Sequence, residues 1–356
     1  MYRRSTALVA ATGLALTGLV TMAPGASAAP KKFVVVKGLD NPRQLAWDER
    51  SGALVVAEAG RGGATCGEEG CFGATGSVSR IAHPDSEDAR ARTILSGLYS
   101  SSAPDGSFAT GADGADVRGR DLFTIVTGGS PDLPPSPGSD QAGFLLRSSL
   151  GRTTKLANIT AYELANNPDG KQVESNPYAT LALNSSRRVL VADAAANAVI
   201  AVNPRTGRRT LFHEWTPRKG RPEFVPTSLA EDSRGNIYVG GLGSERKGKA
   251  KVVQFSSRGE RLRTWGNFTS VTGIDVDDSG VLYVSELFGG AEGFGQVVRV
   301  TASGRDMIAV PLPSGIAVDG DGNVYVAAWS VADRDGSPGG EESPPLKSGR
   351  ILRVLF

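Results

Sequence analysis

The chain has 356 residues, with 39 Lys and Arg, 37 Asp and Glu, two His and two Cys. Removal of a leader that contains Arg3 and Arg4 would leave 39 − 2 = 37 basic residues, so the mature chain is formally neutral. Phosphate binding needs a clear excess of positive charge, and this balance therefore argues against nucleic acid as a partner. The scarcity of His also removes the usual general base of a Ser or Cys hydrolase.

Residues 1–28 are predicted to be a signal peptide. An apolar run at residues 7–20 follows a pair of arginines, and Ala26-Ser27-Ala28 gives the small-x-small pattern of a signal-peptidase site. We therefore expect cleavage after Ala28 and a secreted, extracellular protein. No later stretch approaches the roughly 18 continuous apolar residues that a membrane span needs, so we expect no transmembrane segment in the mature chain.

The two cysteines, Cys66 and Cys71, are predicted to form a disulfide bond. Export would place them in an oxidising compartment, where a disulfide is the default state of a cysteine pair. A zinc site is disfavoured, because two ligands without a nearby pair of His cannot complete the tetrahedral coordination of Zn²⁺.

One sequence motif recurs along the chain: an apolar strand, a turn of the Asp-Gly type and a second apolar strand. It is clearest at residues 229–241 and 316–328 and weakest at residues 116–126. A repeat of roughly 40–50 residues with hairpin chemistry is typical of a β-propeller. Two further strands follow in each unit, so we expect an all-β, six-bladed β-propeller with four antiparallel strands per blade. The turn residues of the six units fall at Gly52, near Arg120, and at Arg187, Gly235, Gly280 and Gly322.

The two ends of the chain are predicted to close the ring. The last unit stops at its third strand, residues 350–356, whereas residues 32–37 form a spare apolar strand with no blade of its own. If this N-terminal strand joins the last blade, it completes the backbone hydrogen bonds there and leaves no open edge between the first and last blades. Residues 29–356 are then a single domain.

Two copies of the motif, at residues 226–232 and 313–319, continue into Gly-Asn-[Ile/Val]-Tyr-Val. This pattern resembles that of the NHL-like six-bladed propellers. The opening Gly-Leu-Asp-Asn-Pro-Arg-Gln at residues 38–44, the secretory leader and a long Gly-rich insert after Glu58 together resemble the ScyD/ScyE family of exported bacterial proteins. The resemblance extends over residues 33–356. It implies a propeller fold and an extracellular location, but no particular reaction.

The long inserts are predicted to gather on one face of the propeller. The first strand of a blade runs along the central channel and the second runs back, so the start of the first and the end of the second share one rim. We call this the loop-rich rim. Inserts on one face of a repeat array often mark its binding face. They follow second strands at residues 60–76, 128–143, 241–248, 288–295 and 329–349.

Polar side chains are predicted to surround the channel mouth at the loop-rich rim. Glu58, Asp193 and Glu286 occupy equivalent positions at the ends of second strands. Carboxylate, hydroxyl and amide oxygens suit a hard cation, so this mouth is the candidate site for Ca²⁺ or for a polar ligand. The alternative is that the carboxylates cap strand ends and accept hydrogen bonds from backbone N–H groups of the next loop. The starts of the first strands contribute Arg43, Gln44, Thr180, Thr227, Ser228, Thr272 and Ser314.

Residues 319–323, Asp-Gly-Asp-Gly-Asn, resemble the start of a calcium loop, but the downstream Glu that such a loop needs is absent. They fall where each blade has its hairpin turn, so turn formation is the favoured role. Asp275, Asp277 and Asp278 receive the same interpretation.

These observations favour a secreted, non-catalytic propeller that binds a small molecule or an extracellular protein at its loop-rich rim, and we expect a monomer. The alternative is a metal-dependent, calcium-type hydrolase or lactonase that uses Glu58, Asp193 and Glu286. Six-bladed lactonases hold their metal with acidic and amide residues at the channel mouth, and among the first-strand entries only Gln44 fits. We therefore expect no catalytic residue, with Ca²⁺ as the candidate cofactor of the alternative.

Overall fold

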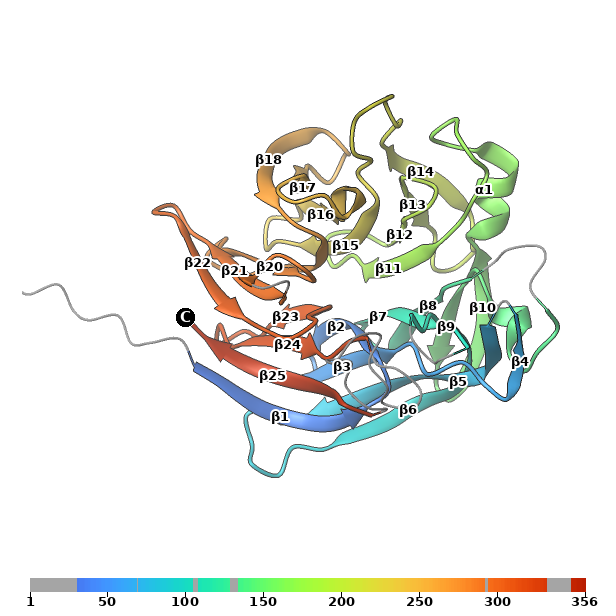
Figure 1. Cartoon of the computed structure of the whole chain (residues 1–356), viewed down its shortest axis with the longest axis horizontal. Helices are drawn as coiled ribbons and strands as arrows, with labels where there is room; N and C mark the ends of the chain where they lie inside the picture. Colours follow the sequence, from blue (N-terminus) through green and yellow to red (C-terminus); the bar gives the residue numbers. More distant parts are fainter. Residues whose placement is uncertain (1–30, 69, 105–107, 129–133, 292–293, 332–346) are drawn as a thin grey trace, which may run out of the picture.

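The computed structural model describes residues 31–68, 70–104, 108–128, 134–291, 294–331 and 347–356. The strands form six antiparallel sheets arranged around a central axis, which confirms the six-bladed β-propeller predicted from the repeats (Figure 1). The predicted signal peptide, residues 1–28, lies outside the described residues. No helix in the described part of the chain is long and apolar enough to cross a membrane.

The first strand of each blade lines the channel, and neighbouring first strands contact one another around the ring. The first strands are β2 (Pro42–Asp48), β7 (Ala112–Arg118), β11 (Pro177–Ala182), β15 (Pro226–Glu231), β19 (Val271–Val276) and β23 (Ile316–Val318). The second strands are β3 (Ala53–Glu58), β8 (Asp121–Val126), β12 (Val189–Asp193), β16 (Ile237–Gly241), β20 (Leu282–Glu286) and β24 (Val324–Ala328).

Two outer strands complete each blade. The third strands are β5 (Gly70–Ala82), β9 (Phe144–Ser149), β13 (Ala198–Val202), β17 (Ala250–Phe255), β21 (Gln296–Val300) and β25 (Gly349–Leu355). The fourth strands are β6 (Ala91–Ser102), β10 (Arg152–Asn158), β14 (Arg209–Glu214), β18 (Arg261–Phe268), β22 (Arg305–Ala309) and, for the last blade, β1 (Lys31–Leu39). The short strand β4 (Thr65–Gly67), the helix α1 (Thr160–Asn166) and the 3-10 turns η1 (Ser139–Gln141) and η2 (Gly243–Glu245) lie in connections.

The hydrophobic core lies between neighbouring blades. Every residue of β3, β12, β16, β20 and β24 is buried, because each second strand is covered on both faces by adjacent sheets. For example, Val55 and Val78 of the first blade belong to the same cluster as Ala115 and Leu122 of the second blade. Strands buried on both faces read as continuous apolar runs, which explains why the second strand of each repeat is so recognisable in the sequence.

The same arrangement of hydrogen bonds holds the hairpin turn between the first and second strands of three blades. In the fourth blade, Oδ1 of Asp232 accepts the backbone N–H groups of Arg234 at 3.0 Å and Asn236 at 2.8 Å. Its Oδ2 accepts the Tyr238 hydroxyl at 3.2 Å. The turn role predicted for Asp277 and Asp319 is confirmed, since they repeat this contact with Tyr283 and Tyr325, each at 3.2 Å.

The ring closes as the sequence predicts. Strand β1 pairs antiparallel with β25, so that Val34 lies opposite Leu352 and Val36 opposite Ile351. The N-terminal strand therefore supplies the outer strand of the blade that the C-terminus leaves incomplete, as Figure 1 shows for β1 and β25. The predicted disulfide is also present, with Cys66 and Cys71 joined at an S–S distance of 2.08 Å across the β4–β5 hairpin.

Candidate functional site

The carboxylates predicted for the loop-rich mouth each form hydrogen bonds within their own blade. Glu58 accepts the backbone N–H of Asp40 at 2.9 Å and the hydroxyl of Ser79 at 2.5 Å. Asp193 accepts the backbone N–H of Asn176 at 2.7 Å. In both cases the donor N–H lies just before the first strand of the blade, so the carboxylate ties the entering loop to the end of the second strand.

Glu286 is bound in the same way, by the backbone N–H of Thr269 and by the side-chain amide of Gln296 at 2.5 Å. Burial raises the pKa of Glu286, and of Glu58 and Asp193 as well, although the accepted hydrogen bonds act in the opposite direction. This is the arrangement that the capping alternative describes. Among the described residues, no three His, Cys, Asp or Glu side chains lie close enough together to hold a metal ion.

Arg43 occupies the loop-rich end of the channel in a buried cluster. Its Nε lies 3.3 Å from Oδ1 of Asp113, and its other nitrogens donate to the backbone carbonyls of Ala109 and Ser330. Arg43 is 6% exposed and Asp113 is fully buried. Burial raises the pKa of Asp113, while the positive charge of Arg43 opposes that rise. The guanidinium thus joins segments of the first, second and last blades.

Gln44 reaches from the first blade to the third. Its Nε2 donates to the carbonyl of Thr180 at 2.6 Å, and its Oε1 accepts the N–H of the same residue at 3.0 Å. The side chain passes over Gly114 of the intervening blade, where a Cβ would lie 2.7 Å from Oε1 of Gln44. Glycine at this position therefore leaves the space that the bridge between the first and third blades requires.

The hydroxyl groups predicted at the mouth link adjacent first strands. Thr227 donates to the carbonyl of Val271 in the next blade at 2.6 Å, and Thr272 repeats the contact with Pro313 at 3.0 Å. The Oγ of Ser228 has no hydrogen-bond partner among the described residues. A cavity of about 20 Å³, which is room for about one water molecule, lies among these first strands.

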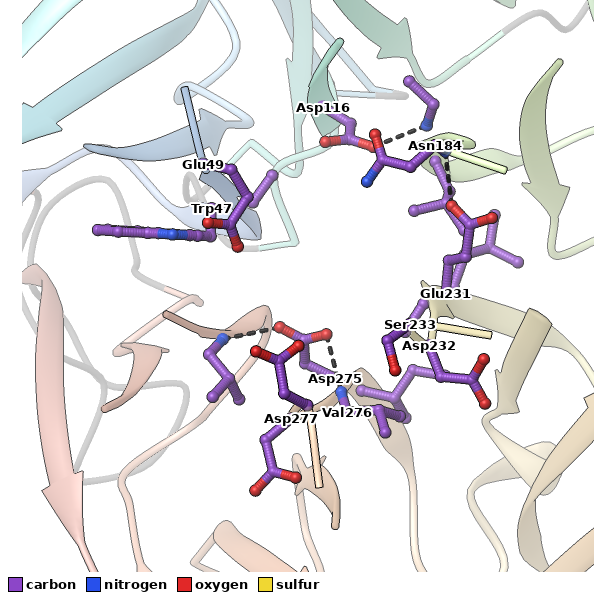
Figure 2. Close-up of a pocket in the computed structure, with 18 of the residues that line it drawn as sticks. Trp47, Glu49, Asp116, Asn184, Glu231, Asp232, Ser233, Asp275, Val276 and Asp277 are labelled. Atoms are coloured by element: carbon purple, nitrogen blue, oxygen red, sulfur yellow. Dashed lines mark hydrogen bonds between the residues drawn. The ribbon is translucent and has the colours of Figure 1, made fainter. Parts of the chain in front are cut away.

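The open part of the channel lies at the opposite mouth, where the hairpin turns between first and second strands are found. A hollow of about 520 Å³ opens there (Figure 2). Acidic residues from several blades contribute to its lining, and Arg234 is the basic residue there. The carboxyl groups of Asp232 and Asp277 point away from the open space, toward the tyrosine hydroxyls that they bind. We call it the acidic hollow. Its acidic residues are Glu49, Asp116, Glu231, Asp232, Asp275, Asp277, Asp278 and Asp319.

Two of these carboxyl groups lie in the wall of the acidic hollow, where Asp116 is buried and Asp275 is partly buried. Asp116 accepts its own strand's Val117 N–H and the Ala182 N–H of the next blade, both at 2.7 Å. Asp275 accepts the N–H groups of Val276 at 2.8 Å and of Val318, again in the next blade, at 2.7 Å. Burial raises the pKa of each carboxyl to about 7.

Asp275 therefore does not belong to a hairpin turn, and its predicted turn role is wrong. It lies inside strand β19, at the repeat position that Asp116 occupies in the second blade. The sequence did contain a signal for this role, because an acidic residue inside an otherwise apolar first strand departs from the repeat pattern. The other blades carry alanine at this position: Ala46, Ala182, Ala230 and Ala317.

Glu231, on the neighbouring wall, accepts the N–H groups of Asn184 at 2.6 Å and Ser185 at 3.0 Å in the preceding blade. Glu49 and Asp278 are exposed at the entrance. Figure 2 shows Glu49, Asp116 and Asp275 around the same open space. The acidic hollow thus combines hydrogen-bonded carboxyl groups within its wall and exposed ones at its edge.

Comparisons with known proteins support the fold. The SBBP beta-propeller repeat matches residues 313–333. No curated protein sequence matches the chain. A gluconolactonase from Xanthomonas campestris shares the fold at 12% identity and a TM-score of 0.52, with 92% of this chain and 90% of that one covered.

Two further solved structures are similar over 92% of this chain. A putative oxidoreductase (glucose dehydrogenase) from Thermus thermophilus is 14% identical, with a TM-score of 0.51 and all of its chain covered (100%). A protein of unknown function from Bacteroides thetaiotaomicron is 11% identical, with a TM-score of 0.54 and 76% of its chain covered. At such identities the likeness establishes the architecture alone. The chain is a six-bladed β-propeller with an SBBP-type repeat in its last blade, and its resemblance to the ScyD/ScyE family stays a prediction.

Proposed function

We propose that this protein is an exported, non-catalytic binding propeller that holds a small cationic ligand in the acidic hollow. The observation that carries the proposal is a hollow of about 520 Å³ around whose open space Glu49, Asp116 and Asp275 lie, with one arginine in the lining. Its volume is within the range of small-molecule sites, and concave pockets with convergent polar groups and shifted pKa values are the first candidates for binding.

An organic cation fits the acidic hollow better than a metal ion. A bound Ca²⁺ needs several oxygens within about 2.3–2.6 Å of one point. The carboxyl groups here are spread around the ring, and no three acidic, His or Cys side chains among the described residues form a metal-binding group. A flexible polyamine carries several separate positive charges, so it can meet carboxylates from different blades at once.

The loop-rich rim, which the sequence favours for binding, has little free space on the axis. The buried Arg43–Asp113 pair and the Gln44 bridge hold the first strands together there, and a cavity of about 20 Å³ lies beside Gln44. A ligand on the axis is therefore better accommodated at the opposite mouth. A partner that contacts the outer loops of the loop-rich rim is compatible with this arrangement.

The alternative function, a calcium-type hydrolase or lactonase, has less support. It requires Glu58, Asp193 and Glu286 to act together, yet each carboxylate is hydrogen-bonded within its own blade. The likeness to the gluconolactonase concerns the fold and supplies no residue for a reaction.

Isothermal titration calorimetry with spermidine tests the proposed function. Glu49 and Asp278 are exposed and lie in the lining, so the variant E49Q/D278N should keep the fold and weaken binding by about tenfold. The control E68Q/E87Q removes the same charge at exposed positions outside the hollow and should bind as the wild type does.

Binding should also tighten between pH 6 and pH 8. Asp116 and Asp275, whose pKa values are raised to about 7, lose their protons over this interval and add negative charge to the wall. An absence of spermidine binding at pH 8, or equal binding by the wild type and E49Q/D278N, would contradict the proposal.

A further inference from the structure

A second concave surface lies at the outer side of the third and fourth blades, and its charge is opposite to that of the acidic hollow. The connection from β14 to β15, together with the start of β17 and the start of β18, encloses a groove of about 450 Å³. This connection leads into a first strand, so the groove opens at the loop-rich rim. We call it the basic groove. Its charged lining residues are Glu214, Arg218, Arg221, Glu223, Lys249, Lys251 and Arg261.

The two acidic residues of the basic groove are already engaged. Glu214 accepts the hydroxyl of Thr216 at 2.8 Å. Glu223 accepts the side-chain amide of Asn197 at 3.3 Å, and Asn197 in turn fixes the loop by accepting the N–H of Val225 at 3.0 Å. These acids therefore serve the fold of the connection, and among the described residues neither forms an ion pair with the cations opposite. Their negative charges still count toward the net charge of the groove.

Four of the cations have no such partner. Arg218, Arg221, Lys249 and Lys251 are exposed, and among the described residues none of them forms an ion pair or a side-chain hydrogen bond. The fifth cation, Arg261, donates to the hydroxyl of Thr264 at 2.7 Å. Five positive and two negative side chains give the groove a formal charge of 5 − 2 = +3, although the mature chain is neutral.

The wall of the basic groove carries a rigid aromatic surface. Trp215 stacks on Phe224 with ring centroids 4.0 Å apart and an interplanar angle of 10°. His213 meets the indole edge-on at 4.6 Å and also contacts Phe255 at 4.6 Å. Both Trp215 and Phe224 belong to the lining and remain partly exposed. An ordered ring beside unpaired cations offers an apolar contact and charge recognition together.

We propose that the basic groove binds an acidic oligosaccharide, with its carboxylate groups at the four unpaired cations and a sugar ring against Trp215. A groove of about 450 Å³ accommodates a few rings and leaves the ends of a longer chain outside. Nucleic acid is the less favoured polyanion, because a formally neutral mature chain lacks the broad positive field on which phosphate-backbone binding depends. This inference is independent of the cationic ligand in the acidic hollow and gives the loop-rich rim a defined binding surface.

Titration of the full mature chain with oligogalacturonate, followed by Trp fluorescence and calorimetry, tests the inference. The variant R218Q/K249Q/K251Q should weaken binding by about tenfold, because each exposed ion pair contributes up to about 1 kcal/mol. The control K31Q/K37Q/R152Q removes the same number of exposed cations outside the groove and should leave the affinity unchanged. Wild-type binding should weaken as the salt concentration rises, since exposed charges are screened.

Three results separate the outcomes. Oligogalacturonate binding that is equal in the wild type and R218Q/K249Q/K251Q, or absent from the wild type, overturns the inference. Tighter binding of a single-stranded oligonucleotide of equal charge also overturns it and assigns the groove to nucleic acid. Spermidine binding should be unchanged in R218Q/K249Q/K251Q, and oligogalacturonate binding unchanged in E49Q/D278N, so a failure at one site is distinguishable from a failure at the other.

Discussion

The side-chain amide of Gln44 forms both of its hydrogen bonds with the backbone of Thr180, although the two residues lie 136 positions apart in the chain. The side-chain amide offers one N–H donor and one carbonyl acceptor, as the backbone of a paired strand does. Gln44 therefore links the first and third blades in the way that a neighbouring strand would. This bridge closes the inner end of the acidic hollow, since Gln44 lines both the hollow and the small space behind it.

The variant Q44A should lower the free energy of unfolding by about 2–4 kcal/mol, because the N–H and the carbonyl of Thr180 each lose a buried partner. Q44E should also be destabilised, since a carboxylate cannot donate to the Thr180 carbonyl. Urea unfolding followed by circular dichroism measures both effects. Q172A, at an exposed glutamine, is the control and should stay within about 0.5 kcal/mol of the wild type. Equal stability of Q44A and Q172A would show that the Gln44 bridge does not contribute to the free energy of unfolding.

Asp116 and Asp275 should make the folded protein less stable as the pH rises from about 4 to about 7. The ordinary pKa of an Asp carboxyl is 3.8, and burial raises the pKa of both groups to about 7 in the folded protein. Between these two pH values the folded state therefore holds protons that the unfolded state has lost. Their favourable contribution is therefore complete below pH 4 and is lost as the pH passes 7. Each group adds at most about 1.4 kcal/mol per pH unit to the slope.

The double variant D116N/D275N should reduce this slope, measured as the difference in unfolding free energy between pH 5 and pH 7. The control D88N/D306N removes two exposed carboxylates and should retain the wild-type slope. A slope that is the same in all three proteins would mean that the carboxyl groups of Asp116 and Asp275 titrate in their ordinary range.

Removal of the Arg43 side chain should be strongly destabilising. R43A leaves the fully buried Asp113 without its counter-charge and removes donors to two backbone carbonyls, so we expect a loss of about 3–5 kcal/mol. The double variant R43M/D113L replaces both charges by apolar groups and should recover part of that loss, as measured by urea unfolding. If R43M/D113L is no more stable than R43A, the cost arises from lost packing and backbone contacts and not from the unpaired charge.

Strand β1, which closes the ring, carries two valines that differ in burial. Val36 is 6% exposed, whereas Val34 is 52% exposed. V36A should therefore lower the unfolding free energy by about 1–3 kcal/mol through lost burial and the resulting cavity, and V34A should have little effect. Thermal unfolding distinguishes the two variants. Equal and negligible effects would indicate that packing of the Val36 side chain contributes little to the stability of the ring.

Much of the fold was predictable because it depends on local chemistry. The Asp-Gly turns, the continuous apolar second strands and the spare N-terminal strand are all properties of contiguous residues, and each has one favourable role in a propeller. The equivalent positions of Glu58, Asp193 and Glu286 were predictable for the same reason. Their hydrogen-bond partners were less predictable, because the carboxylates accept from loop N–H groups that come close only when the blade is assembled.

The sequence by itself determined that this chain forms six blades, where their turns fall, and that the first and last strands of the ring pair. Only the tertiary structure decided which mouth of the channel is open. Asp275 and Asp116 became part of one hollow because each meets the backbone of the following blade, at Val318 and Ala182. Such contacts depend on the angle between neighbouring sheets, and the pattern of residues within a single repeat carries no information about that angle.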